Sequence, residues 1–425
     1  MSGLLQLGAP VSDGAIETVR FFNGRLLSGA DLAREQRARA GLDARIALAG
    51  GTGIAHGLTV ERTSTDLSEP RAAVTVRAGV GVAPSGLVLE LPSDQRLALV
   101  RNDSTSFATA QPCTFGECSA EQAGTYVAGE GLYLLAAAPS QVAAGRAQVN
   151  GLPGDPLSCN VDRDLAGISF RLLEIPANAY NGLSPTDPGF RNRIAYLCFG
   201  SRVGQRWVTQ LYGQADSGKS MYDKFPDCGL TADMLPLALI HFTGALDVTF
   251  LDMWAVRRLL APTDRDDPLA SMAAPARSAT GRAMLAQFAK HYAELTAPSG
   301  ALGGVTAKKD FPNLPACGLL PDLKAADAGT FFAEMTIRGP VHINSAQLEV
   351  LLRESLSSPA IDTSDKAVVW VYAVAENLIE AAKGLASPIR PDPYLAFARG
   401  DLAYRGDARF NLHRWNYANF ALGGS

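Results

Sequence analysis

The sequence comprises 425 residues, of which 47% are hydrophobic and 19% are charged, and its formal net charge at pH 7 is −4. A chain of this length usually folds into more than one domain, and its slight negative charge excludes a general attraction to nucleic acid or anionic lipid. No apolar run approaches the roughly 20 residues of a membrane span, and the N-terminus lacks the basic and apolar segments of a signal peptide. We therefore expect a protein that folds in the cytoplasm without membrane insertion.

Residues 1–105 predict an N-terminal helix followed by a small β module. Ser28 is a good N-cap and Asp31 stands where a capping box needs an acidic side chain, so a helix is expected over 29–48. Alternating apolar residues then predict strands, with a hairpin turn at Pro84–Gly86. The alternating residues of this hairpin are Val74, Val76, Ala78, Val80 and Val82, followed by Leu87, Leu89 and Leu91.

Residues 106–265 predict a central β-rich domain, in which short apolar runs alternate with Gly and Pro clusters. Cys113 and Cys118 bracket a loop at its start, where they could pair or bind a metal. We favour two free thiols, because no second Cys/His pair lies nearby in the sequence. Strands are expected at 131–138, 168–175, 194–199, 235–242 and 248–254.

Residues 266–425 predict a C-terminal α+β domain, entered through a linker at 263–278. An apolar stripe predicts a helix over 280–295, and Asn344 with Gln347 predicts a capped helix over 345–356. Strands are expected at 331–337 and 368–374. The whole chain is therefore predicted to be α+β and β-rich, with short antiparallel strands in several small sheet modules and a few helices.

One motif matches the signature of a phosphate-binding loop, through the spacing of Gly213, Gly218, Lys219 and Ser220. Asp252, at the end of a later apolar run, could then bind Mg²⁺. Such a loop must open a helix, because the helix N-terminus supplies the amide donors and the dipole. Pro226 and Gly229 follow too closely for more than about one helical turn. The sequence therefore favours a polar surface loop over a nucleotide-binding enzyme.

Other catalytic patterns are equally weak in this sequence. The five histidines lie far apart, which favours structural roles, and no Gly-x-Ser-x-Gly nucleophile motif occurs. The triplet Asp162-Arg163-Asp164 is better explained by salt bridges than as the carboxylate pair of a glycosidase, because such carboxylates usually come from separate elements. We therefore expect no enzyme activity and assign no catalytic residue, cofactor or metal ligand.

Two groups of aromatic and arginine side chains are candidates for a protein interface, because Trp, Tyr and Arg dominate interface hot spots. An exposed arginine pair at a strand end, or a C-terminal tail packed on its own core, would explain the same residues. The candidates are Trp254, Arg257, Arg258, Trp415, Tyr417 and Phe420.

Several segments, taken in order, resemble accessory proteins of phage-tail-like contractile injection systems. Residues 21–36 resemble the motif FF(D/N)G-x-LL-x-x-x-D-x-x-x-EQ of these proteins, in which a small β module follows the helix. The resemblance implies a particle component at the baseplate, its surrounding shell or a fibre attachment, and it implies no catalytic residues. The further segments are 53–60, 80–92, 159–163, 191–200, 235–239 and 250–258.

This resemblance also implies the partners of the chain. They would be other subunits of a tail-like particle, with the chain as a homo-oligomer or ring within the assembly and without nucleic acid. The particle would assemble in the cytoplasm and be released by lysis. The alternatives are a receptor- or carbohydrate-binding module of such a particle, a nucleotide-dependent enzyme, and a glycoside hydrolase that acts on the cell wall.

Overall fold

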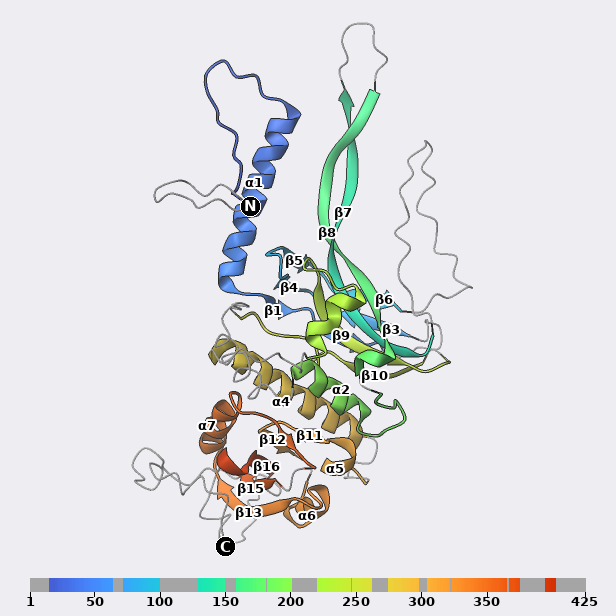
Figure 1. Ribbon diagram of the computed structural model, residues 1–425, viewed down its shortest axis with the longest axis vertical. Helices are drawn as coiled ribbons and strands as arrows, with labels where there is room; N and C mark the ends of the chain where they lie inside the picture. The colour runs from blue at the N-terminus through green and yellow to red at the C-terminus, as the bar shows by residue number, and fades with distance from the viewer. Residues whose placement is uncertain are drawn as a thin grey trace, which may run out of the picture.

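In the computed structural model the molecule is elongated, and two arms rise side by side from a wider body (Figure 1). One arm is a single helix and the other is a long β-hairpin. The fold is α+β with mostly antiparallel strands, as predicted, and the described strands form five small sheets. The structure describes residues 15–63, 72–99, 129–149, 158–180, 182–200, 220–245, 247–261, 274–297, 304–321, 323–364, 367–374 and 394–402.

The helical arm is α1 (Gly29–Gly50), and the predicted capping box at its start is confirmed. Two three-stranded sheets follow it. The first contains β1 (Gly53–Gly57), β4 (Gly79–Val82) and β5 (Val88–Leu91), so the predicted hairpin at Pro84–Gly86 is confirmed as β4–β5. The second contains β2 (Val60–Arg62), β3 (Ala73–Val76) and β6 (Gln95–Ala98).

The apolar run from Val74 to Val82 is divided between these two sheets instead of forming one strand. The chains cross closely at Gly57 and Gly79, where a Cβ atom on Gly79 would lie 2.4 Å from the backbone oxygen of His56. Arg77 and Ala78 bridge the two strands, and the amide of Ala78 donates to Asp94. Glycine therefore permits a sheet crossing that alternation alone does not reveal.

The central sheet has the strand order β10-β9-β7-β8. The strands predicted at 235–242 and 248–254 are confirmed as β9 (Leu235–Phe242) and β10 (Val248–Asp252). Those predicted at 131–138 and 168–175 are the inner ends of the longer strands β7 (Gly131–Val149) and β8 (Ser158–Ile175), whose outer ends form the second arm.

The strand predicted at 194–199 is wrong, because this segment lies in the helix α2 (Phe190–Phe199). Eight of its ten residues are buried, and all of these except Arg191 and Asn192 are apolar or aromatic. A short apolar run of this kind does not distinguish a buried helix from a buried strand by its periodicity. Two short 3₁₀ helices flank α2, Ala177–Tyr180 (η1) and Tyr222–Cys228 (η2).

The lower body is built on α4 (Ala274–Thr296), which begins inside the predicted linker and continues through the predicted helix at 280–295. A four-stranded sheet has the order β12-β16-β15-β13, with bounds Cys317–Leu320, Tyr394–Arg399, Val368–Val374 and Thr336–Ile343. The strand predicted at 368–374 and the helix predicted at 345–356 are confirmed as β15 and α7 (Ser345–Ser355).

The strand predicted at 331–337 is wrong over most of its length. Phe331 ends the short helix α6 (Ala328–Phe331), Glu334 has a positive φ of 70°, and the strand β13 begins at Thr336. Phe331 and Phe332 are fully buried in the lower core, which accounts for their apolar character without a strand. The remaining small elements of the lower body are α5 (Ala307–Asp310), β11 (Asn313–Leu314), β14 (Ile361–Asp362), η4 (Ala325–Asp327) and η5 (Gly400–Leu402).

The helix α4 joins the central and lower parts of the body. Its residues Ala283 and Met284 pack into the core formed by α2 and the central sheet, whereas Phe288 and Tyr292 pack into the core of the lower sheet. Above them, the N-terminal sheets and one face of the central sheet share a third core. The division of the chain into three domains at 105 and 265 stays a prediction.

Candidate assembly interface

The arm α1 is a helix of 22 residues in which Ala38 is the one buried residue. It rises from the body at its C-terminal end and ends away from the body at its N-terminus (Figure 1). Exposed large apolar side chains lie along α1 and the turn before it. They are Phe21, Phe22, Leu26, Leu27, Leu32, Leu42, Ile46 and Leu48.

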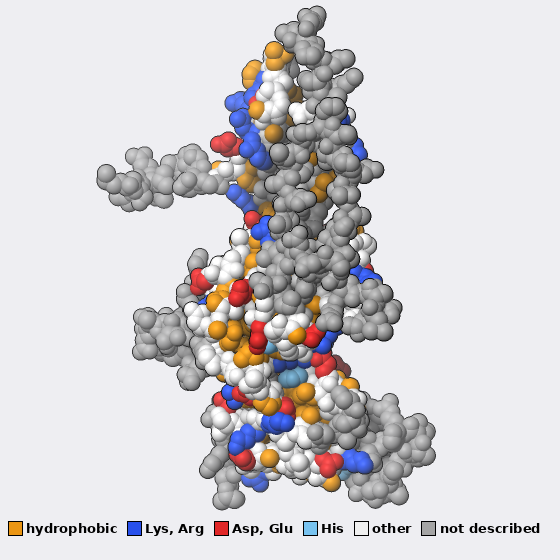
Figure 2. Space-filling model, turned by 90° about the vertical axis from the view of Figure 1, so that its right-hand side faces the viewer, with side chains coloured by type: hydrophobic (Ala, Val, Ile, Leu, Met, Phe, Trp, Pro, Cys, Tyr) orange, Lys and Arg blue, Asp and Glu red, His pale blue; other side chains and the backbone are white. Residues whose placement is uncertain are grey.

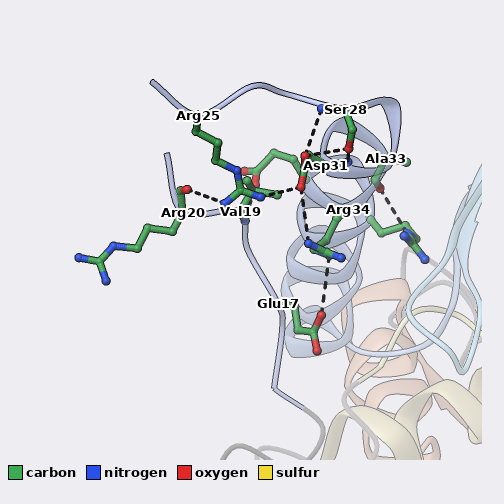
Figure 3. Close-up of polar contacts among 10 residues, drawn as sticks. Glu17, Val19, Arg20, Arg25, Ser28, Asp31, Ala33 and Arg34 are labelled. Carbon is green, nitrogen blue, oxygen red and sulfur yellow. Dashed lines mark hydrogen bonds and ion pairs between the residues drawn. The ribbon is translucent and has the colours of Figure 1, made fainter. Parts of the chain in front are cut away.

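A segment of chain at residues 15–20, here called the strap, lies along one face of α1 (Figure 3). The amide of Val19 donates to Glu35 Oε2 over 3.2 Å, and Arg34 lies 3.9 Å from Glu17. At the top, Arg25 Nη2 donates to Asp31 Oδ1 over 2.7 Å. Hydrogen bonds from Ser28, with the nearby Arg25 guanidinium, hold the pKa of the Asp31 carboxyl below its usual range. The strap therefore supports one face of α1 and leaves the opposite face open.

The second arm is the outer part of β7 and β8, beyond the central sheet (Figure 1). Val142 pairs with Leu165 across the two strands, and Arg146 pairs with Val161. Val142 and Arg146 are four residues apart on one strand, as are Val161 and Leu165 on the other, so all four side chains lie on one face of the hairpin. Val142, Leu165 and Val161 are all exposed there. Figure 2 shows hydrophobic and basic side chains on the narrow upper part of the molecule that the two arms form.

The buried centre of the body is a charged cluster around Arg191 of α2. Its Nε donates to Asp252 Oδ2 over 2.9 Å, and its Nη1 donates to Glu294 of α4. Gln287 of α4 donates to the same Asp252 oxygen over 3.0 Å, and the amide of Ala255 donates to the other. Burial lowers the pKa of the Arg191 guanidinium, but attraction to Asp252 and Glu294 outweighs burial and raises it. The carboxylate of Asp252 is therefore occupied by partners within the chain.

The interface candidates Trp254, Arg257 and Arg258 lie directly after β10, inside the body. Arg257 is buried, its Nη2 donates to the oxygen of Gly57 over 2.7 Å, and its guanidinium lies 5.1 Å from the Trp254 ring. Arg258 donates to four backbone oxygens and lies over the rings of Phe199 and Tyr222. These arginines therefore do not form the exposed pair at a strand end that the sequence also allows, and their role at a partner interface stays a prediction.

Most of the phosphate-loop motif lies outside the described residues, including Gly213, Gly218 and Lys219. Ser220 is described, and its side chain accepts a hydrogen bond from the amide of Asp223 over 3.2 Å. The following 3₁₀ helix, η2, has seven residues, contains Pro226 and ends at Gly229. Ser220 and Asp252 belong to separate hydrogen-bonded networks in this part of the chain.

A cavity of about 750 Å³ lies beside the charged cluster, between β2, the segment before α2, β10 and α4. The acidic side chains that line it are already paired with arginines: Glu61 with Arg77, Asp187 with Arg193, and Glu294 with Arg191. Burial, with the nearby charge of Arg191, lowers the pKa of His291 to about 3, so this imidazole is neutral at physiological pH. Within the described ranges, no group of three or more His, Cys, Asp and Glu side chains is placed to hold a metal ion.

The remaining candidates have the following positions. Cys113, Cys118, Trp415, Tyr417 and Phe420 lie outside the described residues. Cys198, Cys228 and Cys317 are free thiols. Arg163 donates to Asp162 over 2.9 Å, so the predicted salt bridge within this triplet is confirmed. The outer hairpin and the open face of α1 were not among the predicted interface residues.

Comparison with known proteins gives little likeness. No family model and no curated protein matches the sequence. A solved structure titled "Crystal structure of TssK" is 13% identical, covers 50% of this chain and 53% of its own, and has a TM-score of 0.20. Another, "The baseplate complex from the type VI secretion system", is 10% identical, covers 67% of this chain and 49% of its own, and has a TM-score of 0.23. The chain thus spans about half the length of these structures.

No helix in the described part of the chain is long and apolar enough to cross a lipid bilayer.

Proposed function

We propose that this chain is a non-catalytic structural subunit of a contractile, phage-tail-like injection particle, placed at the baseplate, the surrounding shell or a fibre attachment. The observation that carries the proposal is the pair of arms, which hold exposed apolar side chains away from the core. A two-stranded hairpin is marginally stable alone in water, and a lone helix gains most of its stability from packing. Both arms therefore fit surfaces that other subunits cover.

The motifs that resemble injection-system proteins fall on these structural features. Residues 21–36 form the exposed turn and the first eight residues of α1. Residues 191–200 cover α2 with Arg191, and residues 250–258 cover Asp252 and Arg257. The resembling residues thus build one arm and the buried cluster that fixes the body. This placement supports a role in assembly.

The hairpin provides a direct test of this role. The double substitution Val142→Asp and Leu165→Asp places two charges on its exposed face, where neither side chain contributes to a core cluster. In a strain that lacks the wild-type chain, we expect this variant to fold but to be lost from sedimented particles. The matched control is Val350→Asp on α7, which alters an exposed apolar side chain of the body.

The deletion strain gives the outcome that would contradict the proposal. Negative-stain images and protein composition of its particles should differ from those of the parent strain. If the deletion strain forms particles of unchanged shape and otherwise unchanged composition, the chain is not a structural subunit of the particle.

A further inference from the structure

Beside the face that the strap covers, α1 carries a row of side chains, here called the seam, and Glu35 lies at its border with the strap. The seam is formed by Leu32, Glu35, Arg39, Leu42 and Ile46. The spacing along the seam alternates between three and four residues, which is the spacing of the contact positions in a coiled coil. Leu32, Leu42 and Ile46 are 53%, 48% and 70% exposed. The seam therefore has the pattern of a helix that packs against another helix, while no such helix covers it in the described part of the chain.

The middle of the seam holds two opposite charges, Glu35 and Arg39. Glu35 accepts one hydrogen bond, from the amide of Val19 to its Oε2. Among the described residues, Glu35 has no ion pair, and Arg39 has neither an ion pair nor a side-chain hydrogen bond. Residues four apart on a helix can pair with each other, but these two do not. Both charges thus remain available to a partner that presents the opposite sign at each position.

We propose that a second copy of this chain binds this seam, with the two α1 helices antiparallel. This deepens the proposed assembly role and rests on it. In a two-fold symmetric contact, every pair of residues occurs twice: if residue i of one copy contacts residue j of the other, then residue j of the first copy contacts residue i of the second. Placing Glu35 opposite the second copy's Arg39 automatically places Arg39 opposite the second copy's Glu35. The same register places Leu32 opposite the second copy's Leu42, again twice.

The parallel arrangement is disfavoured by the same residues. It would place Glu35 opposite Glu35 and Arg39 opposite Arg39 at the contact positions, where like charges repel. The antiparallel arrangement also separates the two bodies, because α1 joins the body at one end and points away at the other (Figure 1). Ile46 of each copy would then lie near the start of the other helix, where Leu26 and Leu27 are 93% and 51% exposed.

Charge reversal tests this register with the full-length chain. In sedimentation velocity, we expect the wild type to dimerise and Glu35→Arg or Arg39→Glu each to raise the dissociation constant at least about tenfold, because each creates two repulsive contacts. An equimolar mixture of the two single variants should recover dimers, since every contact in the mixed pair is again between opposite charges. The double variant Glu35→Arg/Arg39→Glu should recover dimers by itself.

The matched control is Arg37→Glu, which makes the same charge change on the opposite side of α1, away from the seam. It should dimerise like the wild type. Circular dichroism of each variant separates loss of contact from loss of the helix. A wild type that stays monomeric, or single variants that dimerise as it does, would overturn the proposal. So would a mixture of the two variants that stays monomeric.

These outcomes are distinguishable from failure of the proposed function. A chain that is monomeric but still enters particles through its hairpin would contradict the seam dimer and leave the proposed assembly role intact. A chain that dimerises but is absent from particles, or dispensable for them, would contradict the assembly role and leave the seam dimer intact.

Discussion

Arg191 and Asp252 stand 61 residues apart in the sequence, yet the Nε of one donates to the Oδ2 of the other over 2.9 Å in the interior of the protein. Their side chains are 8% and 1% exposed. The pair fixes α2 against β10, and the bonds from Arg191 to Glu294 and from Gln287 to Asp252 attach α4 to both. A single polar cluster thus sets the position of the helix that joins the central and lower cores.

Removing the arginine should therefore destabilise the whole body. Arg191→Met leaves the Asp252 carboxylate buried with two weaker donors, and breaking a buried pair in this way typically costs about 3–5 kcal/mol. We expect the free energy of unfolding, measured in urea, to fall by about 3 kcal/mol. The control Arg353→Met removes a pair with Glu349 whose side chains are 70% and 71% exposed, and should change stability little. Equal losses in the two variants would contradict a special role for the buried cluster.

The contact of α4 with α7 predicts an unusual response to a glycine substitution. In a helix interior, alanine is normally more favourable than glycine by about 1 kcal/mol. At Gly281, however, a Cβ atom would lie 2.0 Å from the backbone oxygen of Leu356, which no side-chain rotation can relieve. Gly281→Ala should therefore destabilise the protein by about 2 kcal/mol, as overpacking does.

The control for this substitution is Gly329→Ala in α6, where nothing lies within 4 Å of the added atom. Thermal unfolding should show a lower Tm for Gly281→Ala and an unchanged or higher Tm for Gly329→Ala. A higher Tm for both variants would mean that α4 and α7 are not packed this closely.

His291 predicts how stability depends on pH. Its pKa is lowered to about 3 in the folded protein, first by burial and then by Arg191, whereas the pKa of an unfolded histidine is about 6.5. Between these values the unfolded chain binds a proton that the folded chain does not, so falling pH favours unfolding. From pH 7 to pH 5, this group alone should remove about 2 kcal/mol of stability.

The comparison variant is His291→Phe, which cannot titrate and retains an aromatic ring beside Phe311, whose ring centre lies 4.9 Å from that of His291. Urea unfolding at pH 7 and pH 5 should give a smaller pH dependence for this variant than for the wild type. His241, whose pKa is also lowered by burial, leaves part of the dependence in both proteins. The same slope in wild type and variant would show that His291 does not titrate in this way.

The sequence predicts local features of this fold better than features that depend on distant contacts. The caps at Ser28 and Asn344 are correct because a capping box involves residues within one helical turn. The strands β9 and β15 are correct because their apolar runs have the length and composition of buried strands. By contrast, residues 194–199 lie in a helix that is buried on most of its surface. The periodicity of a short apolar run does not distinguish such a helix from a buried strand.

The candidate interface illustrates the same division. The outer hairpin contains Ala143, Gly145 and Gln141, which are poor strand signals, and pairing with β8 decides that it is a strand. The aromatic and arginine residues near 254–258 have the composition of an interface, but their partners lie in β1 and α2 and make them part of the body. The spacing of the seam residues on α1 is visible in the sequence. Only the structure shows which face of the helix the strap covers and hence that the seam is exposed.

The cap at Ser28 should act locally, because α1 has few contacts with the body. Ser28→Ala removes the hydrogen bond from the amide of Asp31 to the serine side chain, and such a change weakens a helix start by about 1 kcal/mol. Hydrogen exchange at the first turn of α1 should therefore quicken about fivefold, while the Tm of the body stays unchanged.

The matched change on the body is Asn344→Ala, which removes the equivalent bond from Gln347 in α7, a helix with buried Leu348 and Leu351. That variant should lower the global free energy of unfolding by about 1 kcal/mol. If Ser28→Ala lowered the Tm as much as Asn344→Ala, α1 would have to unfold together with the body, and the helical arm would not be the independent element that its exposure indicates.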